Sequence, residues 1–577
     1  MKHLLLQLVG FALAAAFGAA AHANIYTVGT GTGCTHGTIQ SAIDAADSHP
    51  GYDVIRLTRS LTYGPESNTV DTSDDLNIVG GFATCTQSAS DGIYTVVSGL
   101  GTGEYASVFD ITTSGSAVVK LRHLHITNAK RYGIYFRGSG TLQTIESTID
   151  RNTVTGIHAE ASAGSVAQLI LDTGTLILQN GLINYSYGGG VYLSGPITMT
   201  MTAPQTVIGL NQALFGGGLY VGGGASANIG SPGYGGLAAI YGNSSDIQGG
   251  GIYSTGTVKL FTADPAKPVR VVDNSAGSAG GGIFVSGPDA LLCAYDFVID
   301  DNQAGIGGSA IYAGGGAFGQ SPYVILNRYD EPECTLPPNA RRCAAGETCN
   351  SISGNTIEHD DSDEPSGAII DLNSYVFFRA DRVKMRGNTG FYAIHGTDSH
   401  IELNHTLIAD NTIGGVLLVA EGANTAIEAL SVDHSTIANN DFAGDFVLHS
   451  PNVLWLSDSI IFQPGIPTFV VNPRVLNVQN LLAGSPLNLP SAPDIVVDYP
   501  MFVDPASGDY HLTRYSHAID FAPADAYDLL DLDGHPYDID LPEVTNRYGP
   551  RDLGAYELQS VTTGCGGSDT VFCNGFD

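Results

Sequence analysis

The string GGGVYL at residues 188–193 recurs along the chain with small changes. Its further copies are GGGLYV (216–221), GGGIYS (249–254), GGGIFV (280–285) and GGSAIY (307–312). An apolar stretch that ends in Asn precedes each copy, and weaker copies continue this series on both sides. The full series is Asn152, Asn180, Asn211, Asn243, Asn274, Asn302, Asn355, Asn388, Asn411 and Asn440. Apart from one interval of 53 residues, these Asn positions repeat about every 29 residues, which indicates a repeat protein.

Each period contains two or three short runs rich in Val, Ile, Tyr and Thr, bounded by Gly and Asn. Such runs predict strands and turns. One turn of such a chain, here called a rung, cannot bury its own apolar face, so rungs stack at about 4.8 Å. Asn at the same turn of each rung tolerates a left-handed backbone and can hydrogen-bond along the stack. Because parallel β-connections are right-handed, the sequence predicts an all-β fold: a right-handed parallel β-helix of roughly a dozen rungs.

Both ends of this solenoid are expected to carry caps, because an open end exposes an apolar core and unpaired strand edges. At the N-terminal end the stretch TIQSAIDAA (38–46) predicts a short amphipathic helix, whose apolar face consists of Ile39, Ala42, Ile43 and Ala46. At the C-terminal end the segment from Phe502 to Glu557 is expected to cover the last rung.

With this repeat, the chain resembles secreted bacterial right-handed β-helix proteins of the pectate-lyase-like superfamily. The alternation of GGG[ILV][YF] with apolar-x-x-Asn is similar to the GGA[ILV] and FxxN repeats of polymorphic outer-membrane proteins. The stretches GDYHLTRYSHAID (508–520), DLDGHP (531–536) and DLGAYE (552–557) resemble the closing segment of many such secreted proteins, although His517 stands where Pro is usual. The resemblance implies the fold and export, and it implies no single activity because the group mixes enzymes and adhesins.

Composition argues against a nucleic-acid partner and against a disordered chain. The chain has 577 residues, 74 of them Gly, and a formal net charge of −34 from 23 Lys and Arg against 57 Asp and Glu. A strongly acidic chain repels phosphate groups, so no nucleic-acid partner is expected. The hydrophobic share of 43% is too high for a disordered acidic chain.

The chain divides into five expected parts. They are a signal peptide at 1–23, an N-terminal cap with the first rungs at 24–95, the repeats at 96–495, a C-terminal capping segment at 496–558 and a tail at 559–577. The signal peptide has a short n-region, an apolar stretch from Leu4 to Ala21 and a small-x-small cleavage site before Asn24. No later stretch has 18 consecutive apolar residues, so no transmembrane segment is expected in the mature chain. The expected location is extracellular or at the cell surface, with the periplasm as the alternative.

Eight cysteines in an exported chain predict disulfides. Local pairing would join Cys34 to Cys85 and Cys565 to Cys573. The remaining four, Cys293, Cys334, Cys343 and Cys349, would pair among themselves in a connectivity that the sequence leaves open. The last three lie in the 53-residue interval, which predicts a disulfide-tied loop inserted near 320–352. Their spacing lacks the close CxxC pairs of a structural zinc site.

One column of polar residues is a candidate site. Six residues before the Asn of successive rungs stand Arg382, His405 and His434, with Asp381 and Asp433 one position earlier. If strand alternation holds, Arg382, Lys384 and Arg386 point to one face. On an exposed sheet face the candidates Asp381, Arg382, Lys384, His405 and His434 could bind an anionic sugar or perform acid–base chemistry. A solvated outer face without chemistry is the favoured alternative, and the catalytic residues of polygalacturonases find no match here.

A second candidate site is a cluster of carboxylates near the C-terminus. Asp531, Asp533, Asp538 and Asp540 surround Gly534 and offer oxygen ligands that suit Ca²⁺. A polar turn is the alternative for this stretch, and no other cofactor is indicated.

The sequence therefore predicts a secreted or surface-associated β-helix protein that is adhesin-like or binds a glycan or another cell-surface ligand without catalysis. The alternative is a polysaccharide lyase or glycoside hydrolase that acts in a groove on the β-helix.

Overall fold

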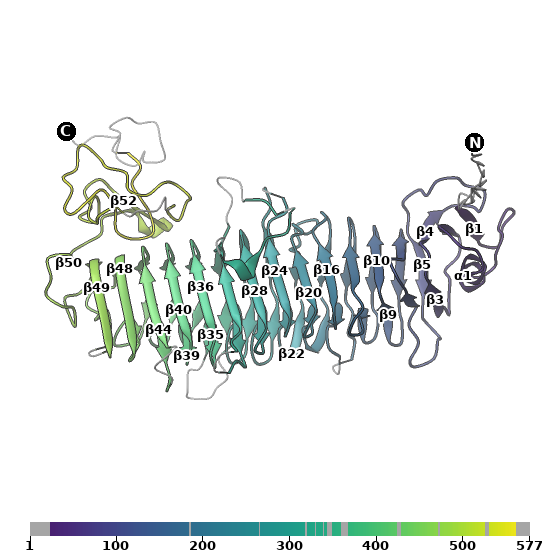
Figure 1. Cartoon of the computed structure of the whole chain (residues 1–577), viewed down its shortest axis with the longest axis horizontal. Helices are drawn as coiled ribbons and strands as arrows, with labels where there is room; N and C mark the ends of the chain where they lie inside the picture. The colour runs from purple at the N-terminus through teal and green to yellow at the C-terminus, as the bar shows by residue number, and fades with distance from the viewer. Residues whose placement is uncertain are drawn as a thin grey trace, which may run out of the picture.

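The computed structural model describes residues 23–183, 186–264, 266–317, 320–328, 331–338, 340–342, 349–358, 367–423, 428–470, 473–524 and 530–560. These residues form an elongated right-handed parallel β-helix whose two ends hold the N-terminal and C-terminal parts of the chain (Figure 1), which confirms the predicted fold. The predicted signal peptide at 1–23 lies outside the described residues except for Ala23. The same holds for the pair Cys565 and Cys573. Within the described part no helix is long and apolar enough to cross a membrane.

Three parallel sheets form the faces of the solenoid. Sheet A contains β1 (Asn24–Val28), β2 (Asp53–Thr58), β4 (Leu76–Phe82), β5 (Thr95–Ser98), β7 (Val118–Arg122), β8 (Leu124–Thr127), β10 (Gly140–Ile145), β11 (Thr148–Asp150), β13 (Ala167–Leu171), β14 (Leu176–Leu178), β16 (Ile197–Met201), β17 (Val207–Gly209), β20 (Ser226–Ile229), β21 (Ile240–Tyr241), β24 (Thr257–Phe261), β25 (Val269–Val272), β28 (Leu291–Tyr295), β29 (Phe297–Asp300), β32 (Tyr323–Leu326), β33 (Ser351–Ser353), β36 (Phe377–Asp381), β37 (Lys384–Arg386), β40 (His400–Asn404), β41 (Leu407–Ala409), β44 (Ala429–Asp433), β45 (Thr436–Ala438), β48 (Val453–Phe462), β49 (Val475–Ala483) and β50 (Ile495–Val497).

Sheet B contains β3 (Asn68–Thr72), β6 (Phe109–Thr113), β9 (Tyr132–Gly138), β12 (Thr155–Glu160), β15 (Val191–Ser194), β19 (Leu219–Val221), β23 (Ile252–Ser254), β27 (Ile283–Ser286), β31 (Ile311–Gly314), β35 (Ala368–Asn373), β39 (Tyr392–Thr397), β43 (Leu418–Glu421) and β47 (Leu448–His449). Sheet C contains β18 (Gln212–Phe215), β22 (Ser244–Gln248), β26 (Ser275–Ala276), β30 (Gln303–Ala304), β34 (Thr356–Ile357), β38 (Thr389–Gly390), β42 (Thr412–Ile413) and β46 (Asp441–Phe442).

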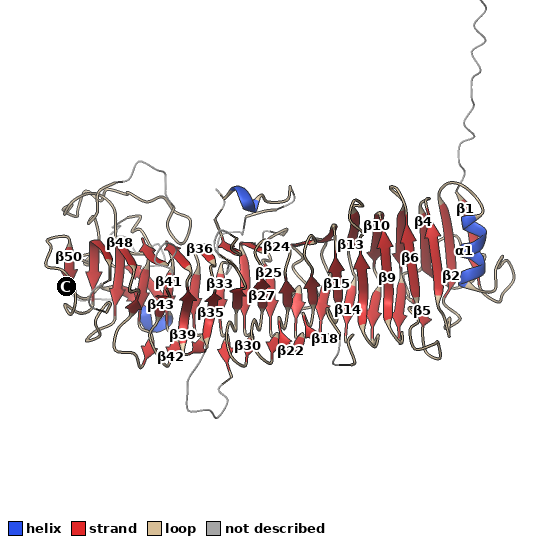
Figure 2. Cartoon of the chain, turned by 60° about the horizontal axis from the view of Figure 1, so that its bottom comes forward, coloured by secondary structure: helices blue, strands red, loops and turns tan. Residues whose placement is uncertain are grey.

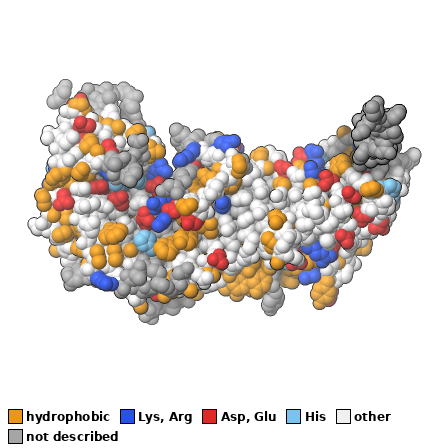
Figure 3. Space-filling model, in the orientation of Figure 1, with side chains coloured by type: hydrophobic (Ala, Val, Ile, Leu, Met, Phe, Trp, Pro, Cys, Tyr) orange, Lys and Arg blue, Asp and Glu red, His pale blue; other side chains and the backbone are white. Residues whose placement is uncertain are grey.

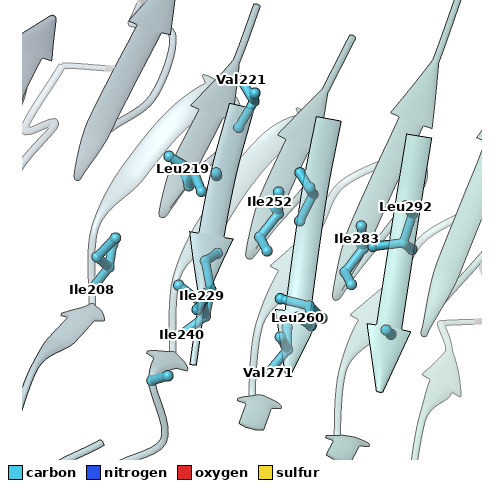
Figure 4. Close-up of a cluster of buried hydrophobic side chains, with 14 of the residues drawn as sticks. Ile208, Leu219, Val221, Ile229, Ile240, Ile252, Leu260, Val271, Ile283 and Leu292 are labelled. Atoms are coloured by element: carbon cyan, nitrogen blue, oxygen red, sulfur yellow. The ribbon is translucent and has the colours of Figure 1, made fainter. Parts of the chain in front are cut away.

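A repeating rung runs through two successive strands of sheet A, then sheet C, then sheet B. Equivalent residues align from rung to rung, so that Leu219 pairs with Ile252 and Ile252 with Ile283. Figure 4 shows their side chains, with Ile208, Ile240 and others, inside the solenoid. The labelled residues are fully buried, so the apolar residues of successive GGG[ILV] copies belong to one continuous core.

The repeated Asn residues form a buried ladder. The Oδ1 of Asn243 accepts two hydrogen bonds from Asn211, one from its backbone N–H at 3.1 Å and one from its side-chain Nδ2 at 3.0 Å. The Nδ2 of Asn243 donates to the Oδ1 of Asn274 and to the carbonyl of Ile208, each at 3.0 Å. The same pattern runs from Asn152 to Asn440 and satisfies the polar backbone where each rung turns.

Close packing against this ladder explains the glycine strings. A Cβ on Gly218 would lie 2.7 Å from the carbonyl of Gly251 and 2.8 Å from the Nδ2 of Asn243. Gly216, two positions earlier, has a φ of +66°, which only Gly adopts at no steric cost. The many Gly residues of this chain therefore allow neighbouring rungs to pack closely.

The predicted N-terminal helix is confirmed as α1 (Ile39–Asp47), with Thr38 as its N-cap. Its buried residues are Ile39, Ala42, Ile43 and Ala46, as expected from their spacing. The helix lies at one end of the solenoid in Figure 2 and packs on β1, β2 and β3.

Two disulfides agree with the expected pairing. Cys34 is bonded to Cys85, and Cys293 on β28 is bonded to Cys334 in the short 3-10 helix η1 (Pro332–Cys334). Cys349 is also disulfide-bonded, and Cys343 lies outside the described residues. The second bond ties the inserted loop back to sheet A.

The C-terminal segment does not cover the end of the solenoid as expected. Residues 499–524 and 530–558, here called the lateral cap, lie alongside the last rungs, above β44 to β49 in Figure 1. The cap includes β51 (Phe502–Asp504), η2 (Pro505–Ser507) and β52 (Asp509–Leu512). The reason is a second apolar core. The outward residues Leu407, Ala409, Ala438 and Ile460 of sheet A are buried against the cap residues Leu512, Ile519 and Phe521.

Candidate functional site

Arg382, His405 and His434 do form a column, and each occupies a bend. Strand register aligns Asp381, Asn404 and Asp433, the residues that precede them. All three column residues have φ between +44° and +52°, so the backbone turns between β36 and β37 and at the equivalent points of the next rungs. The prediction that strand alternation directs Arg382, Lys384 and Arg386 to one face is therefore wrong for Arg382, which lies in the bend between the two strands. Polar residues such as His favour this left-handed conformation, which gives the column a structural cause.

The lateral cap covers this column. His405 is 7% exposed and His434 is 3% exposed, and their ring centroids lie 5.0 Å apart. Tyr537 of the cap lies 5.2 Å from His405 and 5.4 Å from His434, measured between ring centroids. The Nδ1 of His405 lies 2.8 Å from Asp381, and its Nε2 has no hydrogen-bond partner among the residues that the structure describes. Burial lowers the pKa of His405, although Asp381 opposes that effect. The column is not an open catalytic face.

Arg551 of the cap completes this buried cluster. Its guanidinium lies 2.9 Å from the Nε2 of His434 and 3.7 Å from Asp458, and it forms an ion pair with Asp538 at 2.7 Å. Within the described residues, a metal-ligand group with atoms within 4.8 Å of one another is formed by Asp433, His434 and Asp458. The Arg551 cation already lies against this group, so we assign no metal there.

Lys384 and the carboxylates of Asp531, Asp533 and Asp538 each have a partner in the structure. Lys384 forms an ion pair with Asp533 at 3.1 Å, and His511 lies 2.8 Å from the same carboxylate. Asp531 is fully buried and accepts hydrogen bonds from the backbone N–H groups of Asp533, His535 and Glu557. Asp538 pairs with Arg551, and Asp540 is exposed. Asp531 thus accepts backbone hydrogen bonds as the carboxylate of a polar turn does. The described residues bring no three of these carboxylates together as metal ligands.

An aromatic stripe follows the outer face of sheet B. Seven rings stack one over the next, with centroid distances of 4.3 to 5.1 Å and interplanar angles of 3 to 22°. They are Tyr132, His158, Tyr192, Tyr220, Tyr253, Phe284 and Tyr312. From His158 onward each ring occupies the same register position of consecutive rungs. Tyr132 and Phe284 are buried, and the other five rings are partly exposed and present their edges in one line.

Small residues lie beside the stripe. Two positions after the ring residue the column contains Ser194, Ser286 and Gly314. A Cβ on Gly314 would lie 3.3 Å from the hydroxyl of Tyr312, so the ring leans over this column. Most of the rings are half-buried, and desolvation raises the pKa of Tyr220 to about 12. The Tyr220 hydroxyl is therefore neutral near pH 7, and a neutral phenol can both donate and accept hydrogen bonds.

A polar cluster continues the stripe on the next rungs. The position of Tyr312 is occupied by Asp371 and then by His395. The Nδ1 of His395 lies 3.3 Å from Asp371, and its Nε2 lies 3.3 Å from Glu421. Burial would lower the pKa of His395, but the two carboxylates outweigh it and raise the pKa. The two carboxylates therefore favour the cationic form of His395.

Hydrophobic side chains, a class that here includes Tyr, gather along the lower edge of the middle of the solenoid in Figure 3. This is the region between β9 and β35 in Figure 1, where the strands that hold the stripe lie. Few charged side chains lie over the middle of the solenoid on the face that Figure 3 shows.

The stripe leaves a pattern in the sequence that predicts it. The residue after the apolar position of each GGG[ILV] copy is aromatic in the copies at 188–193, 216–221, 249–254 and 280–285, and again at Tyr312. No protein-family model, no curated protein and no solved structure matches the chain.

Proposed function

We propose that this chain is an exported, surface-acting β-helix protein that binds a neutral polysaccharide along the aromatic stripe, as an adhesin-like binding protein and without cleaving the glycan. The observation that carries the proposal is the alignment of seven stacked rings on the outer face of consecutive rungs.

The stripe suits a sugar chain in its chemistry and its repeat. Tyrosine combines a rigid apolar ring with a polar tip, so it supplies contact area and hydrogen bonds at low cost in conformational entropy. Each ring is already held by its neighbours, so little freedom is lost on binding. One ring follows another at about 4.8 Å, the strand spacing, which is close to the length of one pyranose unit. A polysaccharide lying along the solenoid axis would meet the same group at each sugar.

Charge favours a neutral ligand. The chain carries a formal net charge of −34, so an acidic polymer is repelled at long range. The disulfides support export, because such bonds persist in oxidising compartments. A neutral cell-surface or extracellular polysaccharide is the partner that satisfies both conditions.

Removal of two neighbouring rings from the stripe is expected to weaken polysaccharide binding at least tenfold. The double variant Tyr220→Ala/Tyr253→Ala interrupts the stripe at its centre, whereas Tyr220→Phe/Tyr253→Phe keeps the stack and removes only the hydroxyls, so its loss should be smaller. The measurement is affinity electrophoresis in gels that contain neutral glucan, mannan or xylan.

The matched control is Tyr323→Ala/Phe377→Ala. These two rings also stack, with centroids 5.3 Å apart, but on sheet A. The control should bind like the wild type. Equal retardation of the stripe variant and the wild type by a polysaccharide that binds both would contradict the proposal.

A second candidate function is acid–base cleavage of the bound glycan at His395, favoured by the two carboxylates that flank this imidazole. A protonated His395 can act as a general acid next to a carboxylate base. Because its pKa is raised, cleavage would be present at lower pH and lost as the pH rises through that pKa. Release of new reducing or unsaturated ends by the wild type, and not by His395→Ala, would establish this second function. No release between pH 5 and 9 would leave binding alone.

A further inference from the structure

The lateral cap lies beside the C-terminal end of the solenoid, and Leu489 and Ile495 pack against the core there, so that in the part of the chain that the structure describes only one strand edge of this end is left uncovered. The last long strand, β49, pairs with β48 along its whole length, whereas β50 pairs only with Leu481 to Ala483. Among the described residues, the edge of β49 from Val475 to Gln479 that faces away from β48 has no partner strand. Such an edge presents free N–H and C=O groups to another strand.

On β49, residues in the register of buried core positions are partly exposed to solvent. Leu454 and Leu456 on β48 are 0% and 1% exposed. Their partners on β49 are Leu476, which is 40% exposed, and Val478, which is only half-buried. Val475 beside them is 45% exposed. A solenoid normally covers its terminal repeats with a polar face, so this end has the character of an interface.

Charge identifies the occupant. Residues 475–493 contain no Asp, Glu, Lys or Arg, and the two flanking charges, Arg474 and Asp494, cancel. In a chain of net charge −34, this is a surface at which two copies can meet without close repulsion. An acidic or basic partner would find no complementary charge here.

The opposite end favours a closed pair over a filament. α1 covers the N-terminal core there, so the two ends do not present matching open edges. A head-to-tail contact would need the free edge of β49 to meet that covered end. Two copies related by a two-fold axis instead use the same edge twice.

We propose that two copies of this chain associate end to end through antiparallel pairing of their β49 edges, from Val475 to Gln479. The contact joins the two hydrophobic cores and satisfies the free backbone groups. This dimer is independent of the proposed glycan binding, although it would place two aromatic stripes on one particle.

Proline offers a selective test of edge pairing. The N–H of Val475 donates to Asn452 next to β48, so strand alternation directs the N–H of Leu476 away from β48. Leu476→Pro therefore removes a donor from the free edge and leaves the bonds to β48 in place. Asn477→Lys is a second variant, which adds a charge to an exposed side chain at the centre of the edge.

The experiment is sedimentation velocity on the mature chain over a range of concentrations. The wild type is expected to reach twice the monomer mass, and both variants should sediment as monomers with an unchanged circular dichroism spectrum. Ser431→Lys, in the same outward column two rungs inside, should stay dimeric. A monomeric wild type at all concentrations would overturn the proposal, as would dimeric edge variants. Dimers that form only after removal of residues 561–577 would also overturn it, by showing that the chain's own tail occupies the edge.

Discussion

Replacement of Asn243 by Ala is expected to lower the free energy of unfolding by about 4 kcal/mol. The substitution leaves the buried backbone N–H of Asn211 without its acceptor and removes the hydrogen bonds from the Nδ2 of Asn243 to Ile208 and Asn274. A buried unsatisfied group costs about 2 kcal/mol, and each lost hydrogen bond costs about 1 kcal/mol. The measurement is urea unfolding followed by far-UV circular dichroism.

Asn228 provides the control for this ladder prediction. It belongs to the same rung, but it lies on β20 in an outward register with Thr200 and Lys259. Asn228→Ala should change the free energy of unfolding by less than about 0.5 kcal/mol. Similar losses from both substitutions would mean that the ladder does not stabilise the solenoid.

Arg551→Met is expected to release the lateral cap locally. The side chain of Arg551 is 2% exposed, and its removal leaves Asp538 and Asp458 without their cation. Loss of one partner from a buried charged cluster costs about 3 kcal/mol. Because the cost falls on the contact between cap and solenoid, amide hydrogens of the lateral cap should exchange about a hundredfold faster, while those of β16 to β31 keep their rates.

A partly exposed ion pair at the same interface provides the comparison for Arg551→Met. Lys384 and Asp533 have side chains that are 34% and 27% exposed, and such pairs contribute about 0 to 1 kcal/mol. Lys384→Met should therefore alter cap exchange by less than about fivefold. If Arg551→Met changed exchange no more than Lys384→Met, the buried cluster would not be what holds the cap.

The fold could be predicted because its cause repeats in the sequence. The Asn ladder needs Asn243 and its equivalents at one position per rung, and the close approach at Gly218 excludes any side chain there. The helical spacing of Ile39 and Ala42 likewise depends only on local sequence. Features that recur in every rung, or that depend on near neighbours, leave a readable pattern.

The site could be predicted only in part, because its character depends on a segment distant in sequence. His405 and His434 were correctly placed in one column, but their burial comes from Tyr537 and Arg551, more than a hundred residues later. The outward apolar residue Leu407 indicates that something covers this face, but the sequence does not show that the lateral cap does so. The same limit applies to His395 and Glu421, which meet through register between rungs.

The most direct test of the proposed binding surface is hydroxyl-radical footprinting of the protein with and without a bound neutral polysaccharide. We predict that Tyr192, Tyr220, Tyr253 and Tyr312 become protected together, while the exposed Tyr515 and Tyr548 of the lateral cap keep their oxidation rates. Binding of a polysaccharide that leaves all four stripe tyrosines as reactive as in the free protein would contradict the account.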